Sequence, residues 1–353
     1  MVPGRVSMVM VNWNGIEFLD RFVPSVLSQT YPNIEFLVID NASEDGSVDW
    51  LKAQHPKLRV LRQDRNVGYA GGHNLGIRLS TGEFYMPLNC DLILTPTFVS
   101  EMVGAINASP EAGSVTGKLL RLGVDGTPST SIDSTGHVLF KTRIVANRGE
   151  GERDTGQYDT HTEVFGVSGT APLYRRAMLE SVRMGDDYLD EDYFAYWEDV
   201  DLDWRAQHAG WRARYAPRAV AHHVRLGSLA GRQEWTRMIS FRNRYLTLVK
   251  NDRLPDLIRD LRYVLVYENK QWHRLFFQPR FRHLWRMVPS LLRSLPGAVR
   301  KRRRIMATSR GGPARRHFVD LPYRQWRRLR RRTLRELALV GAGSAVFAYF
   351  IFR

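Results

Sequence analysis

The sequence predicts an α/β fold with a mostly parallel central sheet flanked by helices, followed by a basic helical C-terminal extension. Three observations lead to this prediction: an alternation of strand-like and helix-like segments, acidic residues at two strand ends, and a charge imbalance between the two halves. With 353 residues, 43% of them hydrophobic, the chain can bury the core of one large domain plus an appendage. Its one cysteine, Cys90, excludes an intrachain disulfide and favours a reducing, cytosolic compartment.

The first part of the chain alternates short apolar runs with helix-like spans. The start is expected to be a first strand and not a leader peptide, because it lacks a long apolar core and a cleavage site. The segments are VSMVMV (6–11), IEFLDRFVPSVLSQ (16–29), EFLVID (35–40), SVDWLKAQH (47–55) and LRVLRQ (58–63). This βαβαβ order indicates a parallel sheet with crossover helices.

The following segments extend this pattern. Residues 70–80 suit a helix, and 82–91 form an apolar strand that stops at a polar end. Ligands of such sheets lie beyond the carboxyl ends of the strands, so Asp40 and Asp91 are predicted to face one crevice. From Gly123 to Gly166 the composition indicates loops and short strands over that crevice. Residues 171–182 and 198–210 are predicted to be helical, and 211–217 to form a returning strand.

The C-terminal part is strongly basic. From Ser228 onward there are 30 Lys/Arg and 7 Asp/Glu, a net charge of +23, whereas the first 227 residues carry −7. Basic runs at 301–304 and 327–332 precede an uncharged run of 16 residues, 337–352, just short of the roughly 17 to 25 that span a bilayer. We expect an anionic membrane surface as the partner, with the run inserted as a short span or interfacial helix. The alternative is a core helix packed on the protein.

Two polar loops are candidates for binding a nucleotide. Asp40 can accept a hydrogen bond from a base N–H or a ribose hydroxyl, and the turn after it supplies backbone donors. The alternative is an acidic loop that caps a helix through Ser47. In RNVGYAGGHNLG (65–76) the glycines allow close approach of a ligand, and Asn66 and Asn74 offer amide groups. A glycine-rich helix entry is the alternative there.

Asn89 and Asp91 are candidates for holding a divalent metal. At the mouth of a strand, side chains at i and i+2 point the same way and can share Mg²⁺ or Mn²⁺. His222 and His223 follow the predicted returning strand, and either can supply an imidazole ligand. The alternatives are a turn that contains two polar residues and a pair of surface histidines.

The densest acidic cluster is EDYFAYWEDVDLDWR (191–205). One interpretation is that its carboxylates stabilise a helix N-terminus. The other is that one carboxylate, held near Tyr196 and Trp197, takes the proton from an attacking hydroxyl, and Asp199 is our choice for that base.

Taken together, these motifs resemble family 2 glycosyltransferases of the GT-A fold, a Rossmann-like α/β fold, and most closely their rhamnosyltransferase-type branch. The resemblance covers roughly residues 5 to 250. It rests on VNWNG, IDNASEDGS, RNVGYAGGHNLG, LNCD, FGVSGTAPLYRRAML, YLDEDYFAYWEDVDLDWR, AGWR and HHVRLGS, in that order. The domain organisation it suggests is a catalytic domain over 1–230, helices packed on it over 231–270, and a basic membrane-associated region over 271–353.

The resemblance implies an inverting transfer without a covalent enzyme intermediate, with a divalent metal (Mg²⁺ or Mn²⁺) at the diphosphate. Asp199 would be the base, with Glu198 beside it. Asp91 and His223 would be on the metal side, with His222 still open. Ser168, Gly169 and Trp197 would lie near the acceptor. The residues implied for the nucleotide are Asn12, Asp40, Asn41, Ser43, Asn66, Gly68, Asn74 and Asn89.

One position departs from the family pattern, because Asn89-Cys90-Asp91 replaces the usual Asp-x-Asp. Asparagine keeps an oxygen ligand but removes a charge, so metal affinity is expected to be weaker.

The function expected is transfer of a sugar, with rhamnose suggested by the branch, from a dTDP- or UDP-linked donor to a glycan or lipid-linked glycan. This would occur at the cytoplasmic face of the cell membrane, in cell-wall or polysaccharide biosynthesis. Two alternatives are a catalytically weak scaffold that binds nucleotide sugars and a nucleic-acid-binding protein that uses the basic tail. No nucleic acid is expected, because the arginines lack a module that recognises bases.

Overall fold

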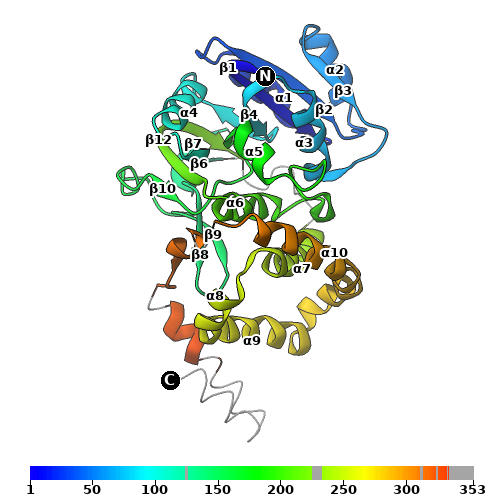
Figure 1. The fold of residues 1–353 in the computed structure, drawn as a ribbon. Helices are drawn as coiled ribbons and strands as arrows, with labels where there is room; N and C mark the ends of the chain where they lie inside the picture. Colours follow the sequence, from blue (N-terminus) through cyan, green and yellow to red (C-terminus); the bar gives the residue numbers. More distant parts are fainter. Residues whose placement is uncertain (124–125, 225–232, 311–312, 323–324, 332, 334–353) are drawn as a thin grey trace, which may run out of the picture.

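The computed structural model describes residues 1–123, 126–224, 233–310, 313–322, 325–331 and 333. A ten-stranded sheet forms the centre of the molecule, with strand order β10-β12-β6-β11-β4-β1-β2-β3 and with β5 and β7 joined at its side (Figure 1). Helices cover both faces of this sheet, as predicted for an α/β fold.

The first half of the sheet is parallel. Its strands are β1 (Val2–Asn12), β2 (Ile34–Asp40), β3 (Arg59–Arg62) and β4 (Gly82–Leu88), joined by α1 (Ile16–Leu27), α2 (Ser47–Gln54) and α3 (Gly68–Leu79). Apolar residues of β1 and β4 are buried on both faces, as expected where helices cover a parallel sheet. The register pairs Asn12 with Asp40, so both polar residues lie at the carboxyl edge.

The second half of the sheet mixes directions. β12 (Arg212–His223) runs parallel to β6 (Ala112–Leu122), whereas β11 (Leu173–Arg175) is antiparallel to both β4 and β6. The remaining elements here are β5 (Leu92–Leu94), β7 (Pro128–Ser134), β10 (Glu163–Val164), α4 (Phe98–Asn107), α5 (Arg176–Val182), η1 (Glu191–Tyr193) and α6 (Glu198–His208). The helix predicted over 198–210 and the returning strand over 211–217 are present as α6 and β12. The helix predicted over 171–182 is wrong in its first part: Leu173–Arg175 form β11, because they pair between β4 and β6, and only Arg176–Val182 are helical.

A small second sheet takes two of its three strands from the segment predicted to form loops and short strands. It contains β8 (His137–Phe140), β9 (Val145–Asn147) and β13 (Phe318–Val319), which follows η4 (Pro313–His317). Phe318 pairs with Leu139, so a strand near the C-terminus joins the middle of the chain. The sequence analysis did not predict this pairing, because a two-residue strand carries no recognisable alternation.

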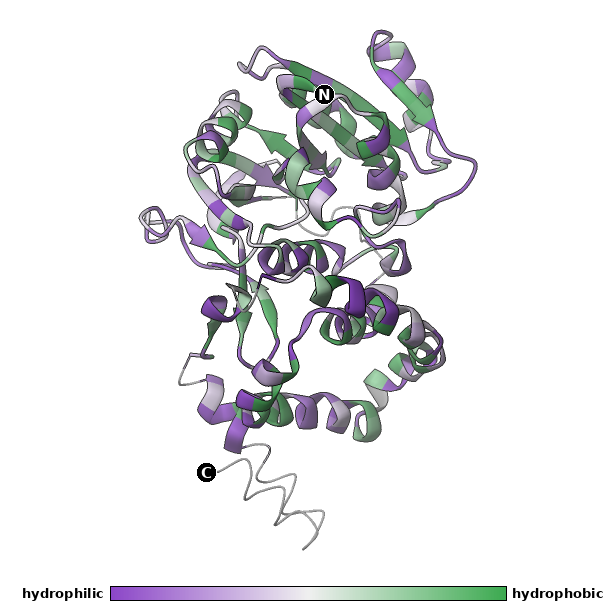
Figure 2. Cartoon of the chain, in the orientation of Figure 1, coloured by the Kyte–Doolittle hydropathy of each residue, from purple (hydrophilic) through white to green (hydrophobic). Residues whose placement is uncertain are grey.

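Basic helices follow the sheet domain and pack on it. They are α7 (Gln233–Asn251), α8 (Leu254–Arg259), α9 (Leu261–Phe277), η3 (Pro279–Met287) and α10 (Val288–Ala307). Figure 2 shows hydrophobic residues concentrated in the sheet and mixed with hydrophilic residues along these helices. Arg143, buried after β8, bonds Asp252 and Asp260 of the helical part at 2.9 and 2.8 Å, which ties the two parts together.

Among the helices that the structure describes, none is long and apolar enough to cross a membrane. The apolar run 337–352, predicted to insert into a bilayer, lies outside the described residues.

Candidate active site

The residues predicted to bind the nucleotide include a hydrogen-bonded cluster at the carboxyl edge of β1 and β2. The Asn12 amide Nδ2 donates to Asp40 Oδ1 (3.0 Å), Ser43 Oγ (3.0 Å) and Ser47 Oγ (2.8 Å). Asp40 Oδ2 in turn accepts from the backbone N–H of Ser43 at 3.0 Å. These side chains are buried, so Asn12 and Asp40 fix the shape of the 41–47 turn in this structure.

The same cluster continues into the glycine-rich segment. Asn41 Nδ2 donates to the Gly68 carbonyl at 2.9 Å, and Asn66 Oδ1 accepts from the Gly68 N–H at 2.8 Å. Gly68 has φ of +76°, and a Cβ there would collide with the carbonyl oxygen and ring of Phe194. Glycine is therefore required at the start of α3, where the 41–47 turn meets the loop before α6.

Asn74 has a different role from the one predicted. It is fully buried; its Nδ2 donates to the Leu189 carbonyl at 2.8 Å and to Glu191 at 3.0 Å. Its Oδ1 accepts from the N–H groups of Tyr188 and Leu189. Both ends of the amide thus hold the 188–191 loop against α3, and the nucleotide contact predicted for Asn74 has no support in these bonds.

The predicted metal side contains a carboxylate next to an imidazole. Asn89, Cys90 and Asp91 form the turn between β4 and β5, so the strand alternation assumed for Asn89 and Asp91 does not apply. His223, at the end of β12, places Nε2 3.3 Å from Asp91 Oδ1, and its Nδ1 lies 2.8 Å from Asp133 Oδ2. Burial favours the neutral ring, but hydrogen bonds with Asp133 and Asp91 outweigh it and raise the pKa of His223 to about 9.

The chemistry of Asp91 and His223 fits a hard divalent cation. A ligating histidine normally donates its other ring N–H to a carboxylate, which is the arrangement that Asp133 provides. No contact between His222 and Asp91 is among the described hydrogen bonds and ion pairs, whereas His223 makes one. Within the described residues no group of three or more His, Cys, Asp or Glu side chains is arranged so that it could hold a metal ion by itself, so diphosphate oxygens and water would have to complete the coordination.

The predicted base lies at the start of α6. Asp199 Oδ2 accepts from the Gly169 N–H at 2.9 Å, and Tyr69 donates its hydroxyl to the Gly169 carbonyl. Glu198 next to it is buried; burial, and then the charge of Asp199, raise its pKa well above the usual range. The two neighbouring carboxyl groups therefore differ in their environment. Burial favours the protonated form of Glu198, whereas the side chain of Asp199 is partly exposed.

A histidine behind Asp199, and its contact with Asp203 of the predicted acidic cluster, were not predicted. His137 of β8 places Nδ1 2.9 Å from Asp203 Oδ2 and Nε2 3.8 Å from Asp199 Oδ2. Burial raises the pKa of Asp203 to about 7 despite its bond to His137. Burial lowers the pKa of His137, but the bond to Asp203 and the charge of Asp199 raise it more. No sequence motif marks His137, since its place depends on the small sheet.

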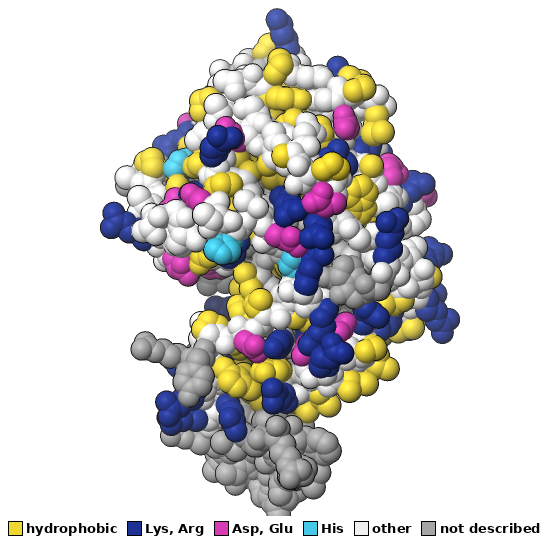
Figure 3. Space-filling view, turned by 60° about the vertical axis from the view of Figure 1, so that its left-hand side comes forward, with side chains coloured by type: hydrophobic (Ala, Val, Ile, Leu, Met, Phe, Trp, Pro, Cys, Tyr) yellow, Lys and Arg dark blue, Asp and Glu magenta, His cyan; other side chains and the backbone are white. Residues whose placement is uncertain are grey.

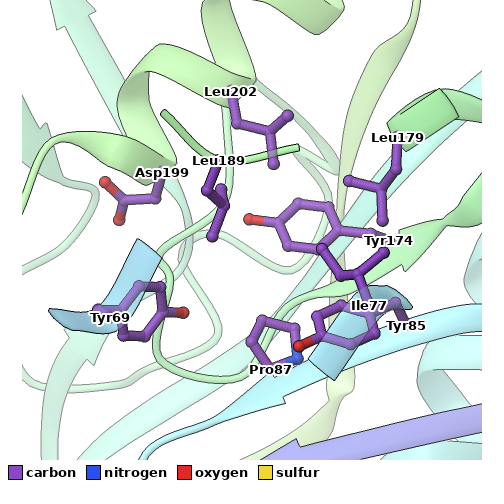
Figure 4. Close-up of a pocket in the computed structure, with 9 residues that line it drawn as sticks. All are labelled: Tyr69, Ile77, Tyr85, Pro87, Tyr174, Leu179, Leu189, Asp199 and Leu202. Carbon is purple, nitrogen blue, oxygen red and sulfur yellow. The ribbon is translucent and has the colours of Figure 1, made fainter. Parts of the chain in front are cut away.

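A small cavity of about 10 Å³ lies beside Asp199, with room for about one water molecule. In Figure 4 Asp199 projects from α6 on one side and Tyr69 faces it from α3, with Tyr174 and Tyr85 farther in. Its lining residues are Tyr69, Ile77, Tyr85, Pro87, Tyr174, Leu179, Leu189, Asp199 and Leu202. Apart from Asp199, the wall consists of apolar groups and tyrosine rings, so a proton acceptor is placed at the edge of a largely apolar space.

The loop that leads into α6 has an unusual backbone. Phe194, Tyr196 and Trp197 have φ of +63°, +67° and +74°, a region that side chains disfavour. Asn243 of α7 donates from Nδ2 to the carbonyls of Tyr193, Ala195 and Tyr196 at 2.8 to 2.9 Å. Helix α7 therefore holds the loop that sets the position of Trp197 and Asp199.

Residues 7–183 match the profile of Glycosyl transferase family 2, which is half of the chain. The chain belongs to this family. As a family 2 glycosyltransferase it is an enzyme of the class that the motifs predicted, and the prediction of the family is confirmed.

Relatives of this glycosyltransferase agree with that assignment. It is 27% identical over 248 residues to the N-acetylglucosaminyl-diphospho-decaprenol L-rhamnosyltransferase of Mycobacterium tuberculosis, which covers 62% of this chain and 76% of that enzyme. S. aureus TarS in complex with UDP-GlcNAc superposes with a TM-score of 0.53 at 14% identity, over 86% of this chain and 91% of that one. GalNAc-T7 with UDP, GalNAc and Mn²⁺ gives 0.58 at 14% identity, over 82% and 55%. These likenesses confirm the GT-A fold.

Proposed function

We propose that this glycosyltransferase transfers a sugar from a nucleoside-diphosphate donor with inversion, using Asp199 as the base. The observation that carries the proposal is the placement of Asp199, which is partly exposed at the edge of an apolar cavity and oriented by the Gly169 N–H. Asp199 takes the proton of the acceptor hydroxyl, and the oxygen forms a bond to the anomeric carbon. The bond from that carbon to the nucleoside diphosphate breaks, and no covalent enzyme intermediate forms.

The donor is proposed to bind at the carboxyl edge of β1 and β2. Asn12, Asp40, Asn41 and Ser43 shape the turn there, and Asp40 is proposed to accept a hydrogen bond from a base N–H or a ribose hydroxyl. Asn66 and Gly68 form the facing wall, with Asn89 at the end of β4. The two solved structures that contain UDP or UDP-GlcNAc support a nucleotide-linked donor, and the name of the rhamnosyltransferase supports rhamnose as the sugar. A dTDP- or UDP-linked form of that sugar is the proposed donor.

Asp91 and His223 are proposed to hold a divalent cation, with Asp133 orienting His223. When bound, Mg²⁺ or Mn²⁺ supplies charge neutralisation for the departing diphosphate. GalNAc-T7 was crystallised with Mn²⁺, which supports a cation in this fold.

Behind the base, His137 is proposed to act as a positioning residue. Its ring lies between Asp203 and Asp199, so a proton on the ring would steady the Asp199 carboxylate in its ionised form. Ser168, Gly169 and Trp197 are the proposed acceptor side, because Gly169 contacts Asp199 directly and Trp197 precedes the base by two residues.

The acceptor is proposed to be a glycan or a lipid-linked glycan at the cytoplasmic face of the cell membrane. A relative whose name specifies a diphospho-decaprenol acceptor supports a lipid-linked substrate. The basic runs of the C-terminal part would favour an anionic membrane surface.

The donor class can be tested by ligand-induced shifts in melting temperature. Ligand at about 100-fold excess over Kd stabilises the folded state by about 2.7 kcal/mol. We expect dTDP or UDP species to raise the Tm by several degrees with Mn²⁺ or Mg²⁺ and by less with a chelator. In Asp91→Asn the difference between metal and chelator should shrink. No Tm shift with any nucleotide would contradict the proposed donor site and favour a protein that no longer uses a donor.

A further inference from the structure

Four aromatic side chains form an exposed group on the helical part of the chain, away from the proposed site. We name Trp272, Phe276 and Phe277 of α9 with Trp285 of η3 the aromatic patch; their exposed fractions are 37, 56, 67 and 38%. The ring of Phe276 lies 6.0 Å from that of Trp272, 6.4 Å from Phe277 and 5.1 Å from Trp285. The four rings are thus one contiguous surface and not scattered residues.

The four rings of the aromatic patch do not belong to the apolar core of the helical part. The neighbouring Leu275 and Leu284 are buried, so α9 and η3 already have an inner apolar face. The aromatic patch is an additional outer face, and Leu292 of α10 is likewise 59% exposed. Contiguous apolar surface of this kind on a soluble protein marks a place where another apolar phase or partner docks.

The exposed charges on η3 and on the first part of α10 are positive, and the exposed carboxylate beside them is Glu234 of α7, whose Oε1 lies 3.9 Å from His283 Nδ1 of η3. Arg282 and Arg286 are exposed on η3, and Arg293 is exposed on the following helix, α10. Among the described residues from 254 to 310 the carboxylates are Asp256, Asp260 and Glu268, and none of them is exposed. Asp260 bonds Arg143 and Arg315, and Glu268 bonds Arg244 and Tyr245. Figure 3 shows hydrophobic and basic side chains side by side in the lower part of the molecule.

We propose that the aromatic patch and its exposed arginines lie on an anionic lipid bilayer. Tryptophan and phenylalanine rings enter the region between headgroups and acyl chains, while guanidinium groups bind lipid phosphates. This proposed membrane surface is separate from the uncharged run at 337–352, because it lies on α9 and η3 and combines exposed rings with neighbouring arginines.

The aromatic patch contacts α7, the helix that holds the loop before α6. Phe241 and Tyr245 of α7 pack against Trp272 at ring distances of 6.4 and 6.2 Å, and Asn243 between them holds the loop before α6. A bilayer that binds α9 and η3 is therefore one helix away from Trp197 and Asp199. The use of this placement, presenting a lipid-linked acceptor to the base, rests on the proposed function; the membrane contact itself does not.

The contact can be tested with a fluorophore at one position, because Cys90 is the chain's single cysteine and is buried. Phe277→Cys, labelled with an environment-sensitive dye, is mixed with vesicles of phosphatidylcholine alone or with added phosphatidylglycerol. We expect a blue shift with the anionic vesicles that high salt reduces. The matched control is Leu27→Cys on α1 of the sheet domain, where the side chain is 56% exposed against 67% for Phe277, and this position should not respond. The wild-type chain, treated with the same dye, measures the background from labelling at positions other than the introduced cysteine.

Co-sedimentation provides a second measurement on the full chain. The double variant Phe276→Ser/Phe277→Ser should lower the vesicle partition coefficient by about ten-fold, whereas Leu27→Ser should leave it unchanged. Binding of the full chain with no dye response at 277 would overturn the proposal and assign binding to another segment. A dye response that rises with protein concentration without vesicles would also overturn it, because a second copy would then cover the patch. Neither assay depends on sugar transfer, so failure here is distinct from failure of the proposed function.

Discussion

At the scale of single residues, the buried histidines differ in whether a carboxylate lies beside the ring. His137 and His223 each contact two carboxylates, and their pKa values are raised. His73 of α3 has only the Tyr85 hydroxyl at 2.8 Å from Nδ1, and burial lowers its pKa to about 3. The rings of His137 and His223 therefore bind a proton more readily than a free imidazole, whereas burial favours the neutral form of His73.

His73 consequently makes folding stability depend on pH. Its folded pKa of about 3 lies below the unfolded value of 6.5, so its contribution is complete above 6.5 and is lost as the pH falls toward 3. Between pH 7 and pH 5 we expect the wild-type chain to lose about 2 kcal/mol of unfolding free energy through this group. His73→Asn keeps an acceptor near Tyr85 but cannot titrate, so urea unfolding at the two pH values should show a smaller loss. Equal losses in both proteins would contradict this assignment.

The residues that the sequence could identify are those with a local signal. Asp40 ends a strand, Asp91 lies in the turn between two strands and Asp199 begins a helix, and at each place polar residues interrupt an apolar pattern. His137 and Asp133 carry no such signal, because their partners are 66 and 90 residues away. Asn74 has an apparent signal, an amide in a glycine-rich segment, but its bonds serve the 188–191 loop.

At the scale of elements, the loop before α6 depends on α7, a helix that comes later in the chain. Its positive φ values at Phe194, Tyr196 and Trp197 are disfavoured, and one side chain of α7 satisfies its carbonyls. The sequence predicted α6 and α7 as helices, but it could not predict the backbone of the loop, since no glycine marks the positions with positive φ.

Removing the Asn243 amide should therefore loosen the loop. Asn243→Ala leaves buried carbonyls without a donor, and we expect about 1 to 3 kcal/mol lower stability and a marked fall in transfer rate. The donor-induced Tm shift should change little, because the nucleotide end lies on β1 and β2. Asn107→Ala, at the exposed end of α4, is the matched control and should change neither property. A stable Asn243→Ala protein with normal transfer would show that α7 does not hold the loop.

At the scale of the whole molecule, the acidic and basic halves are not separate bodies. Lys250 of α7 and Lys301 of α10 both bind Asp190 in the acidic half, and Lys250 also lies 2.8 Å from Asp201 of α6. The sequence showed the charge imbalance, from which a partner outside the chain was inferred. Part of that positive charge is instead used inside the fold, because buried carboxylates require partners. The exposed arginines near the aromatic patch remain for an external surface.

The most direct test of the account is the transfer rate of Asp199→Asn with a nucleotide-sugar donor and a lipid-linked acceptor. This change keeps the size of the side chain and removes its basicity, so the rate should fall by about 10² to 10⁴ while the donor-induced Tm shift is retained. Asp186→Asn, an exposed carboxylate outside the site, should transfer at the wild-type rate. An unchanged rate in Asp199→Asn, or an equal loss in Glu198→Gln alone, would contradict the assignment of Asp199 as the base.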